Sequence, residues 1–195
     1  MRPSLEDLIA TLRHRCTGAK TASVIALDGR SGVGKSTLAQ QLAARLNAAI
    51  IPCDDFYAGG VELRREPPDQ LADLCLDRDR LKSVLARVKS GRPAHYHAFD
   101  WSAFDGRLGT EPTRVEPAPV IIVEGVYAAH PDLRPLIDLA VLVELDEPER
   151  MKRLVAREGR ISDWEGQWHR AENWYFTQLA PHEAYDLIVD AAEAQ

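Results

Sequence analysis

Short apolar runs recur along the chain, and longer stretches with an amphipathic helical period separate them. An apolar run of four to eight residues that is bounded by polar turn residues is typical of a strand buried on both faces. The pattern predicts five such strands, at residues 22–28, 48–53, 120–123, 139–145 and 186–189.

Between these runs, apolar residues return every three or four positions, as on one face of a helix. We expect a first helix at 4–15, capped by Ser4, and a second at 35–47. Residues 80–89 and 148–158 are also predicted to be helical. The apolar face of the first helix comprises Leu5, Leu8, Ile9 and Leu12, and that of the second comprises Leu38, Leu42 and Leu46.

Strands that alternate with helices and are apolar throughout predict a parallel sheet covered on both faces, the α/β class. We find no internal repeat and expect residues 1–195 to form a single domain. Residues 58–119 are the least regular part. We expect this long excursion between the second and third strands to bind the acceptor substrate, because binding residues are concentrated in long loops.

Composition and charge narrow the classes of partner. The chain has 195 residues, of which 45% are apolar and 28% charged, ordinary values for a domain with its own core. It carries 24 Lys and Arg against 30 Asp and Glu, a net charge of −6. This balance argues against a nucleic-acid binder, which usually has a basic stripe, but it leaves small anionic ligands open.

The cysteines and the first residues predict the compartment. Cys16, Cys53 and Cys75 are far apart and show no metal-ligand spacing, so we expect reduced thiols rather than disulfides or a zinc site. No signal-peptide core is present in residues 1–20, and no window approaches the roughly 20 apolar residues of a membrane span. We expect a cytoplasmic protein with no membrane partner.

Residues 29–36 (GRSGVGKS) match the phosphate-loop pattern GxxxxGK[ST] in full, and a predicted strand and helix flank them. The glycines let backbone N–H groups wrap a phosphate chain, and the helix N-terminus adds partial positive charge. Lys35 is expected to reach the β- and γ-phosphates, and the Ser36 hydroxyl to bind Mg²⁺. The residues expected to bind ATP are Gly29, Ser31, Gly32, Val33, Gly34, Lys35, Ser36 and Thr37.

Other landmarks distinguish among phosphate-loop proteins. The chain has no NKxD segment of the kind with which signalling GTPases read guanine. Motor and AAA-type ATPases usually end the third strand with Asp followed by Glu, whereas this strand ends with the single Glu124. The small-molecule kinases remain as the predicted class.

With the phosphate loop, three further segments resemble the uridine kinase family and its phosphoribulokinase relatives. They are CDDFY at 53–57, VEG at 123–125 and the arginine-rich segment 150–160. The resemblance covers residues 20–190. It implies a P-loop NTPase fold, a doubly wound five-stranded parallel sheet in strand order 2-3-1-4-5 with helices on both faces and an arginine-rich lid at 150–170.

The resemblance also implies roles for single residues. Asp54 matches the catalytic aspartate, and a base at the end of the second strand makes chemical sense because an attacking hydroxyl must lose its proton. The adjacent Asp55 is a second candidate for the base, but the spacing to Phe56 and Tyr57 favours Asp54. The alternative is that both acids only cap a turn. Tyr57 resembles a substrate-wall residue. Glu124 resembles the acid that orients Mg²⁺, which prefers oxygen ligands.

Four arginines recur every three or four residues after the fourth strand, at Arg150, Arg153, Arg157 and Arg160. In kinases of this kind, such a lid clamps the triphosphate and offsets charge on the transferring group. We expect Arg153 and Arg157 to contribute to catalysis. A surface helix that collects arginines for solubility would show the same pattern.

Residues 95–101 (HYHAFDW) occupy the place of a substrate segment in this family, although a core β-hairpin would have the same letters. The candidates for acceptor binding there are Tyr96, His97, Phe99 and Trp101. Asp77 matches the second acid of a ribose-binding segment. The first acid is replaced by Leu71, a departure that Asp69 or Asp73 could compensate after a local shift.

Three tryptophans, Trp164, Trp168 and Trp174, follow the lid on a predicted helix. We expect this helix to pack against the sheet.

These features predict an ATP-dependent kinase that transfers the γ-phosphate of Mg·ATP to a hydroxyl of a small molecule, with a nucleoside such as uridine or cytidine as first candidate. Another alcohol, such as a sugar, vitamin or antibiotic, is the alternative within the class. A nucleoside monophosphate kinase would need extra basic residues, for which Arg64, Arg65 and Arg92 are candidates. A nucleotide-binding regulator without catalysis is the alternative from another class. The sequence leaves the acceptor and a homo-oligomeric state open.

Overall fold

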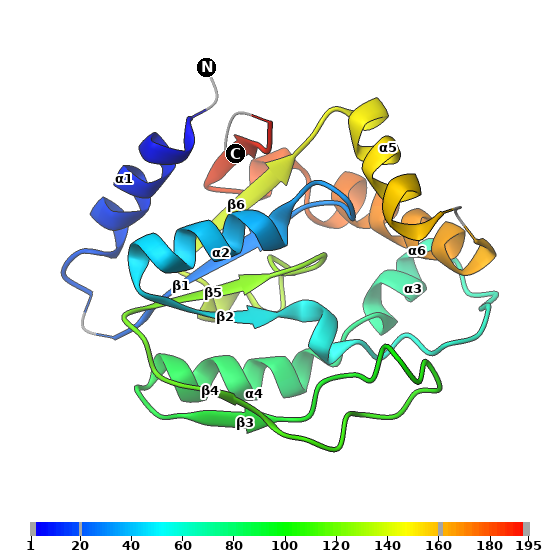
Figure 1. Ribbon diagram of the computed structural model, residues 1–195, viewed down its shortest axis with the longest axis horizontal. Helices are drawn as coiled ribbons and strands as arrows, with labels where there is room; N and C mark the ends of the chain where they lie inside the picture. Colours follow the sequence, from blue (N-terminus) through cyan, green and yellow to red (C-terminus); the bar gives the residue numbers. More distant parts are fainter. Residues whose placement is uncertain (1–2, 20, 160–161, 193–195) are drawn as a thin grey trace.

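A parallel five-stranded sheet forms the centre of the computed structural model, which describes residues 3–19, 21–159 and 162–192 (Figure 1). Its strands lie in the order β2-β5-β1-β6-β7. They are β1 (Ser23–Asp28), β2 (Ala48–Pro52), β5 (Val120–Glu124), β6 (Leu139–Glu144) and β7 (Leu187–Asp190). Because β3 and β4 belong to a separate hairpin, this order is the predicted 2-3-1-4-5, and the prediction is confirmed.

The central strands are apolar because both of their faces are covered. Every residue of β1 and β5 is buried. The register pairs Ile25 of β1 with Ile122 of β5 on one side and with Leu139 of β6 on the other. The same register places Leu27 opposite Glu124, so the polar residue that ends β5 meets the phosphate loop that follows β1.

Helices α1 (Leu5–Cys16) and α2 (Lys35–Leu46) cover one face of the sheet. Ser4 caps α1 in a capping box with Asp7, as predicted for Ser4. The apolar faces of both helices pack on the residues of β1, β5 and β6 that point to this side; the packed residues include Leu8, Leu12, Leu38, Leu42, Ile25, Leu27, Ile122 and Val141.

Helices α3 (Pro68–Leu74), α4 (Arg78–Lys89) and α6 (Asp163–Trp174) contribute to the core on the opposite face. Leu81 and Leu85 of α4 lie in the same cluster as Val24 and Ala26 of β1. Helix α3 packs against α6, which joins the irregular middle of the chain to its C-terminal part. The tryptophan-rich helix was predicted to pack on the sheet; it packs mainly on α3 instead, and Trp168 and Trp174 lie partly buried against the core of this face.

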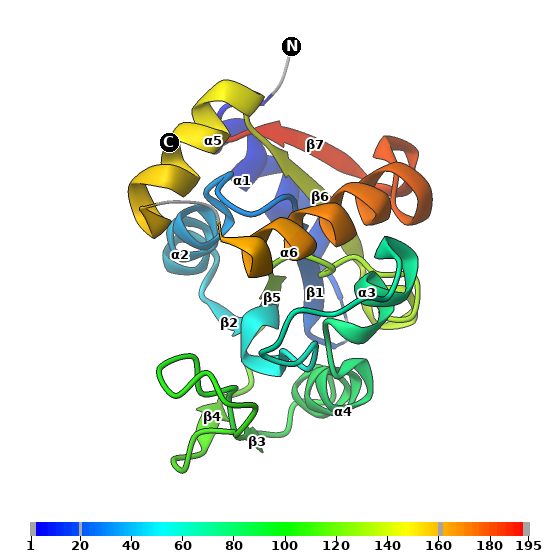
Figure 2. The same ribbon diagram turned by 90° about the vertical axis from the view of Figure 1, so that its right-hand side faces the viewer.

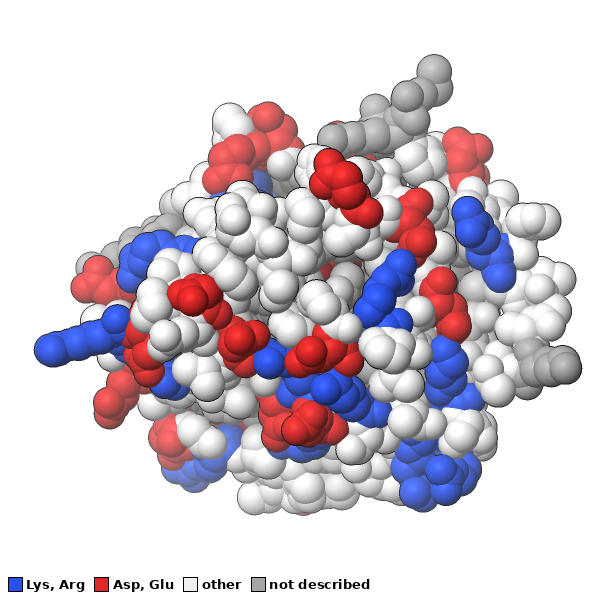
Figure 3. Space-filling view, turned by 180° about the vertical axis from the view of Figure 1, so that it is seen from behind, with Lys and Arg blue, Asp and Glu red and all other residues white. Residues whose placement is uncertain are grey.

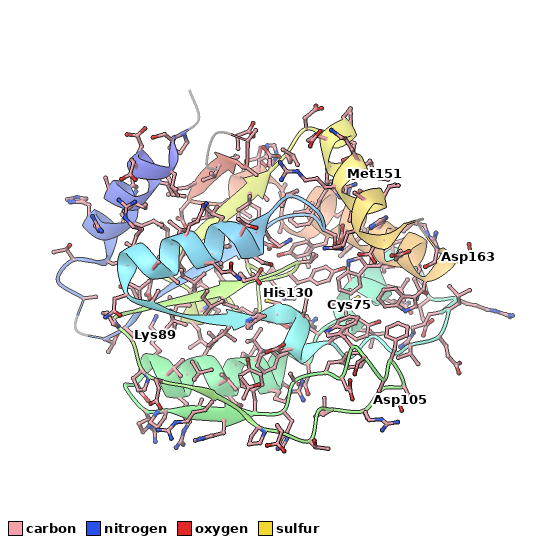
Figure 4. The ribbon with its side chains drawn as sticks, in the orientation of Figure 1. Cys75, Lys89, Asp105, His130, Met151 and Asp163 are labelled. Carbon is pink, nitrogen blue, oxygen red and sulfur yellow. The ribbon has the colours of Figure 1, made fainter. Side chains whose placement is uncertain are left out.

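Residues 58–119 contain two elements that the periodicity did not predict, the short helix α3 and an antiparallel hairpin of β3 (Ala94–Tyr96) and β4 (Thr113–Val115). The hairpin lies beside α4, below the main sheet in Figure 1. Its long loop reaches toward the ends of the parallel strands, and Asp105 lies on it in Figure 4.

Helix α5 (Glu147–Glu158) follows β6, and α6 then crosses in front of the carboxyl ends of the sheet strands, which face the viewer in Figure 2. On the face shown in Figure 3, acidic and basic side chains are interleaved rather than gathered by sign. Across the described ranges, no helix combines the length and apolar character that spanning a membrane requires.

Candidate active site

The phosphate loop joins β1 to α2 and encloses the amine of its own lysine. Lys35 Nζ donates to the carbonyl oxygens of Gly29 at 2.8 Å and Arg30 at 3.0 Å. A Cβ atom on Gly29 would lie 2.3 Å from the Val143 oxygen, and one on Gly32 would lie 2.8 Å from Leu154 Cγ. Both glycines also have positive φ. The loop can therefore adopt this course only without side chains at these positions.

The two residues predicted to hold Mg²⁺ lie together. Ser36 Oγ, in the first turn of α2, donates to Glu124 Oε1 at 3.0 Å. A hydroxyl and a carboxylate are hard oxygen donors of the kind that Mg²⁺ takes, usually with several waters in the remaining positions. Burial raises the pKa of Glu124, and nearby Lys35 opposes this shift. The donor set thus fits a magnesium ion beside the phosphate loop.

Asp54 and Asp55 lie in the 3-10 turn η1 (Cys53–Phe56) that follows β2. The hydroxyl of Tyr96 donates to Asp55 Oδ2 at 2.6 Å, which ties Asp55 to the hairpin. Asp54 opens onto solvent in the cavity. The protein around it raises the pKa of its carboxyl, Lys35 opposes this shift, and the charge of Asp55 adds to it. The geometry therefore favours Asp54 over its neighbour as a proton acceptor.

A cavity of about 900 Å³ joins these groups. Its walls come from the phosphate loop, the ends of β2 and β5, the hairpin loop, α5 and α6. Predicted site residues that line it are Ser31, Gly32, Gly34, Lys35, Ser36, Thr37, Asp54, Glu124, Arg153, Arg157 and Trp101. One end of the cavity is thus a phosphate-binding loop, and Asp54 and Glu124 lie beside it.

Aromatic rings line the other end. Trp101 and Phe104 come from the hairpin loop, and Trp164 and Trp168 come from α6. Tyr57 lies behind them, with its ring centroid 5.0 Å from that of Trp101 and 5.7 Å from that of Trp168. Trp101 Nε1 also donates to the Asp54 carbonyl at 3.2 Å, so the hairpin loop is attached to the turn that carries Asp54.

Phe104 is a cavity residue that the sequence analysis missed. Its φ of 44° is in the left-handed region, which a bulky residue rarely occupies. No periodic pattern marks such a position. Its place three residues after Trp101, in the aromatic segment, was the only signal available.

Several predicted acceptor-binding residues lie outside the main cavity. Tyr57 lines a small neighbouring pocket and donates its hydroxyl to the Gly60 carbonyl at 2.6 Å. Tyr96 and Phe99 are buried, and His97 Nδ1 lies 2.9 Å from the Gly109 oxygen. The hairpin alternative is therefore the correct one for Tyr96, because its ring packs on Phe56 in the core.

The interpretation of Asp77 as a ribose-binding acid is also not supported. Asp77 is the N-cap of α4, and its Oδ1 accepts from the backbone N–H of Arg80 at 3.0 Å. It does not line the cavity. An acid that caps a helix and an acid that binds substrate can have the same local sequence pattern. The sequence therefore could not distinguish these two roles for Asp77.

The arginines after β6 have different roles. Arg153 and Arg157, the two expected to contribute to catalysis, line the cavity. Arg150 is buried, donates to the Ser31 carbonyl at 3.0 Å and pairs with Glu147 at 2.7 Å, so it supports the phosphate loop from outside. Arg160 lies outside the described residues.

Two buried carboxylates next to the phosphate loop were not predicted. Asp28 accepts from the backbone N–H groups of Gly29, Tyr127 and Ala129 and from the hydroxyls of Tyr175 and Tyr185. Glu172, on α6, contacts Ser31. Their partners are up to 157 residues away in sequence, so no local pattern could show these contacts.

A parallel sheet in this strand order, with a phosphate loop after β1 and a carboxylate after β2, defines a phosphate-loop protein with a kinase-type fold. The chain belongs to the AAA_18 family of AAA domains, whose family model matches residues 25–173. The family description contains the term AAA, whereas β5 ends in the single acid Glu124 rather than in the Asp-Glu pair of AAA-type ATPases.

The chain is similar to kinases in sequence and in fold. It is 29% identical to a uridine kinase from Chlamydia pneumoniae over 144 residues, which cover 69% of this chain and 63% of that relative. The structure of a possible uridine kinase from Bacillus stearothermophilus superposes with a TM-score of 0.69 at 22% identity, covering 95% and 99% of the two chains. D-glycerate 3-kinase from Cryptococcus neoformans has a TM-score of 0.65 at 15% identity, with 97% and 96% covered.

Proposed function

We propose that the protein is an ATP-dependent kinase that transfers the γ-phosphate of Mg·ATP to a hydroxyl group of a small molecule. The observation that carries the proposal is the single cavity onto which Lys35, the Ser36–Glu124 pair and Asp54 all open. The similarity to uridine kinases supports the reaction class. A nucleoside such as uridine or cytidine is therefore the first acceptor to test.

In this proposal, Asp54 accepts the proton of the attacking hydroxyl. A raised pKa suits this role, because a base works best when its pKa is nearer to the pH at which the enzyme operates. Lys35, Arg153 and Arg157 would offset charge on the phosphates. Ser36 and Glu124 would hold Mg²⁺, which when bound neutralises part of the charge on the phosphate oxygens.

The charge distribution favours an alcohol over a phosphate as acceptor. Asp54 and Asp55 line the cavity together with Trp101, and none of the three arginines considered for a phosphate acceptor lines it. Arg64 instead binds Glu66 and the Gly59 carbonyl, and Arg92 binds the Ser90 hydroxyl. A second negative charge near Asp54 would be repelled.

ADP release from ATP, measured with pooled nucleosides, sugars, vitamins and nucleoside monophosphates, tests the proposal. Lys35→Ala should abolish transfer. Asp54→Asn should keep ATP binding but lower turnover by about 10²-fold or more, the range that a general base contributes. Asp55→Asn is the matched control, since Asp55 is held by Tyr96, and it should retain most of the turnover.

Three results would contradict the proposal. Normal turnover in Asp54→Asn would show that the base is another group. ATP binding without acceptor-dependent ADP release in any pool would favour a regulator that binds nucleotide without transferring phosphate. Preference for the monophosphate pool would instead identify a phosphate acceptor.

A further inference from the structure

Glu172 is a buried acid that the proposed reaction does not use. It lies in the second half of α6 and is only 1% exposed. Its carboxylate accepts from Trp168 Nε1 at 2.5 Å, from the Ser31 backbone N–H at 3.3 Å and from the Ser31 hydroxyl. Trp168 Nε1 is also 3.1 Å from Ser31 Oγ. One carboxylate thus joins the phosphate loop to the helix that crosses the carboxyl ends of the strands (Figure 2).

A second contact joins the same two elements. Arg30 donates to Asn173 Oδ1 at 2.5 Å, and its guanidinium lies 5.1 Å from the Phe176 ring centre. Arg30 and Ser31 lie at the beginning of the phosphate loop, before residues 32–37, in which the loop ends and α2 begins. Helix α6 therefore holds Arg30 and Ser31 in the first half of the loop, while Lys35, Ser36 and Thr37 in the first turn of α2 line the cavity.

Trp168 extends this connection to the aromatic end of the cavity. Its indole N–H is bound at the phosphate loop, and its ring centroid lies 5.7 Å from that of Tyr57. Ser31 and Trp168 both line the cavity, whereas Glu172 lies behind them. The carboxylate of Glu172 thus sets where the Trp168 ring lies relative to the phosphate loop.

We infer that Glu172 is a positioning residue that couples the phosphate loop to Trp168 on α6 and so keeps water from the space between the loop and the aromatic wall. The inference deepens the proposed kinase function and rests on it. Water near a bound triphosphate competes with the acceptor, so a loosened Trp168 would allow ATP hydrolysis without transfer.

The side-chain chemistry predicts a graded series of variants. Glu172→Ala leaves both Ser31 donors without their acceptor and leaves the Trp168 N–H only the Ser31 Oγ, 3.1 Å away. In Glu172→Gln the amide oxygen can take the place of Oε1, to which all three donors point, but it is uncharged, and the NH₂ group replaces Oε2, which shares the Ser31 N–H, so the contacts are weakened rather than removed. Asp163→Asn is the matched control, because Asp163 is an exposed acid at the far end of the same helix (Figure 4).

The experiment uses Mg·ATP alone, without an acceptor. We expect Glu172→Ala to bind a non-hydrolysable ATP analogue within about threefold of the wild type but to release ADP about fivefold faster or more, because water gains access. Hydrogen exchange of the nucleotide-free loop, residues 29–37, should also be faster in this variant. Glu172→Gln should lie between, and Asp163→Asn should match the wild type in all three measurements.

Unchanged ADP release and unchanged loop exchange in Glu172→Ala would overturn the inference, as would a variant that only unfolds at lower temperature. If Glu172→Ala does not fold, the same criteria apply to Glu172→Gln. A wild-type protein that does not bind the analogue would refute the proposed function. Hydrogen exchange of the loop needs no nucleotide and would then test by itself whether Glu172 couples the loop to α6. A loop exchange rate in the variant equal to that of the wild type would refute this coupling.

Discussion

At the scale of single residues, the ionised carboxyl of Asp54 suits the proposed reaction but lowers the stability of the folded protein. The pKa of Asp54 is raised by the surrounding protein and by Asp55. An acid whose folded pKa exceeds its unfolded value of 3.8 is destabilising in its ionised form. This loss of stability is absent at a pH below the pKa of the unfolded state and is complete at a pH above the pKa of the folded state.

Asp54→Asn should therefore raise the melting temperature at neutral pH while it removes turnover, a trade-off between stability and activity. The gain should shrink as the pH is lowered toward 4, because the wild-type carboxyl then becomes neutral as well. Thermal unfolding of both proteins across this pH range measures the effect. A gain that is independent of pH would mean that the charge of Asp54 is not its cause.

Burial raises the pKa of Asp28 as well, and its five hydrogen-bond donors oppose that shift only in part. Asp28→Ala should lower the free energy of unfolding by more than about 3 kcal/mol, because it leaves several buried donors unpaired. Tyr185→Phe removes a single donor and should cost about 1 kcal/mol. Urea denaturation of the two variants compares them directly, and equal losses would show that the cluster does not act as one network.

At the scale of elements, short segments between regular elements determine where functional side chains lie. The hairpin loop is tied to η1 by Trp101 and by the bond from the Phe99 backbone N–H to the Asp55 carbonyl at 2.9 Å. Helix α4 begins at its cap, Asp77, directly after the backbone of Asp77 bonds to the Phe56 carbonyl at 2.9 Å. The turn with Asp54 is thus held from two sides.

Asp77→Ala tests whether this acid supports the helix or the substrate. Loss of the N-cap should lower the free energy of unfolding by about 1 kcal/mol. The KM for the acceptor should stay unchanged, because the side chain does not line the cavity. A raised KM with unchanged stability would return Asp77 to the acceptor site.

At the scale of the whole molecule, the cavity is lined by segments that are far apart in the sequence, between Ser31 and His169. The phosphate loop lies on the sheet, whereas α5, α6 and the hairpin loop supply the remaining walls. A ligand that fills this space contacts all of them at once. Binding should therefore stabilise the fold as a unit.

An ATP analogue at 100 times its dissociation constant should raise the free energy of unfolding by about 2.7 kcal/mol. We expect part of this gain to require Mg²⁺, and a chelator should remove that part. In Glu124→Gln the chelator should have little further effect, since the variant loses the carboxylate that we expect to hold the ion. Thermal shift measurements with and without EDTA test this, and a full Mg²⁺ response in the variant would exclude Glu124 as a ligand.

The sequence alone determined the strands, their parallel order through the resemblance, and the phosphate loop. These features depend on residues that are neighbours in the chain: burial on both faces makes a strand apolar throughout, and a loop that wraps phosphate needs its glycines and lysine at adjacent positions. The placement of Lys35, Ser36, Asp54 and Glu124 followed because carboxyl ends of parallel strands meet at one edge of a sheet.

Only the tertiary structure decided which distant side chains share the cavity. Glu172 meets Ser31 across 141 positions, and Phe104 reaches the site through a loop with no periodic pattern. Asp54 and Asp77 have the same local pattern, because each is an acid next to a turn or a helix start. Asp54 nevertheless faces the cavity, whereas Asp77 caps α4. Long-range packing selects between such roles, because burial and hydrogen-bond partners come from segments that local patterns do not contain.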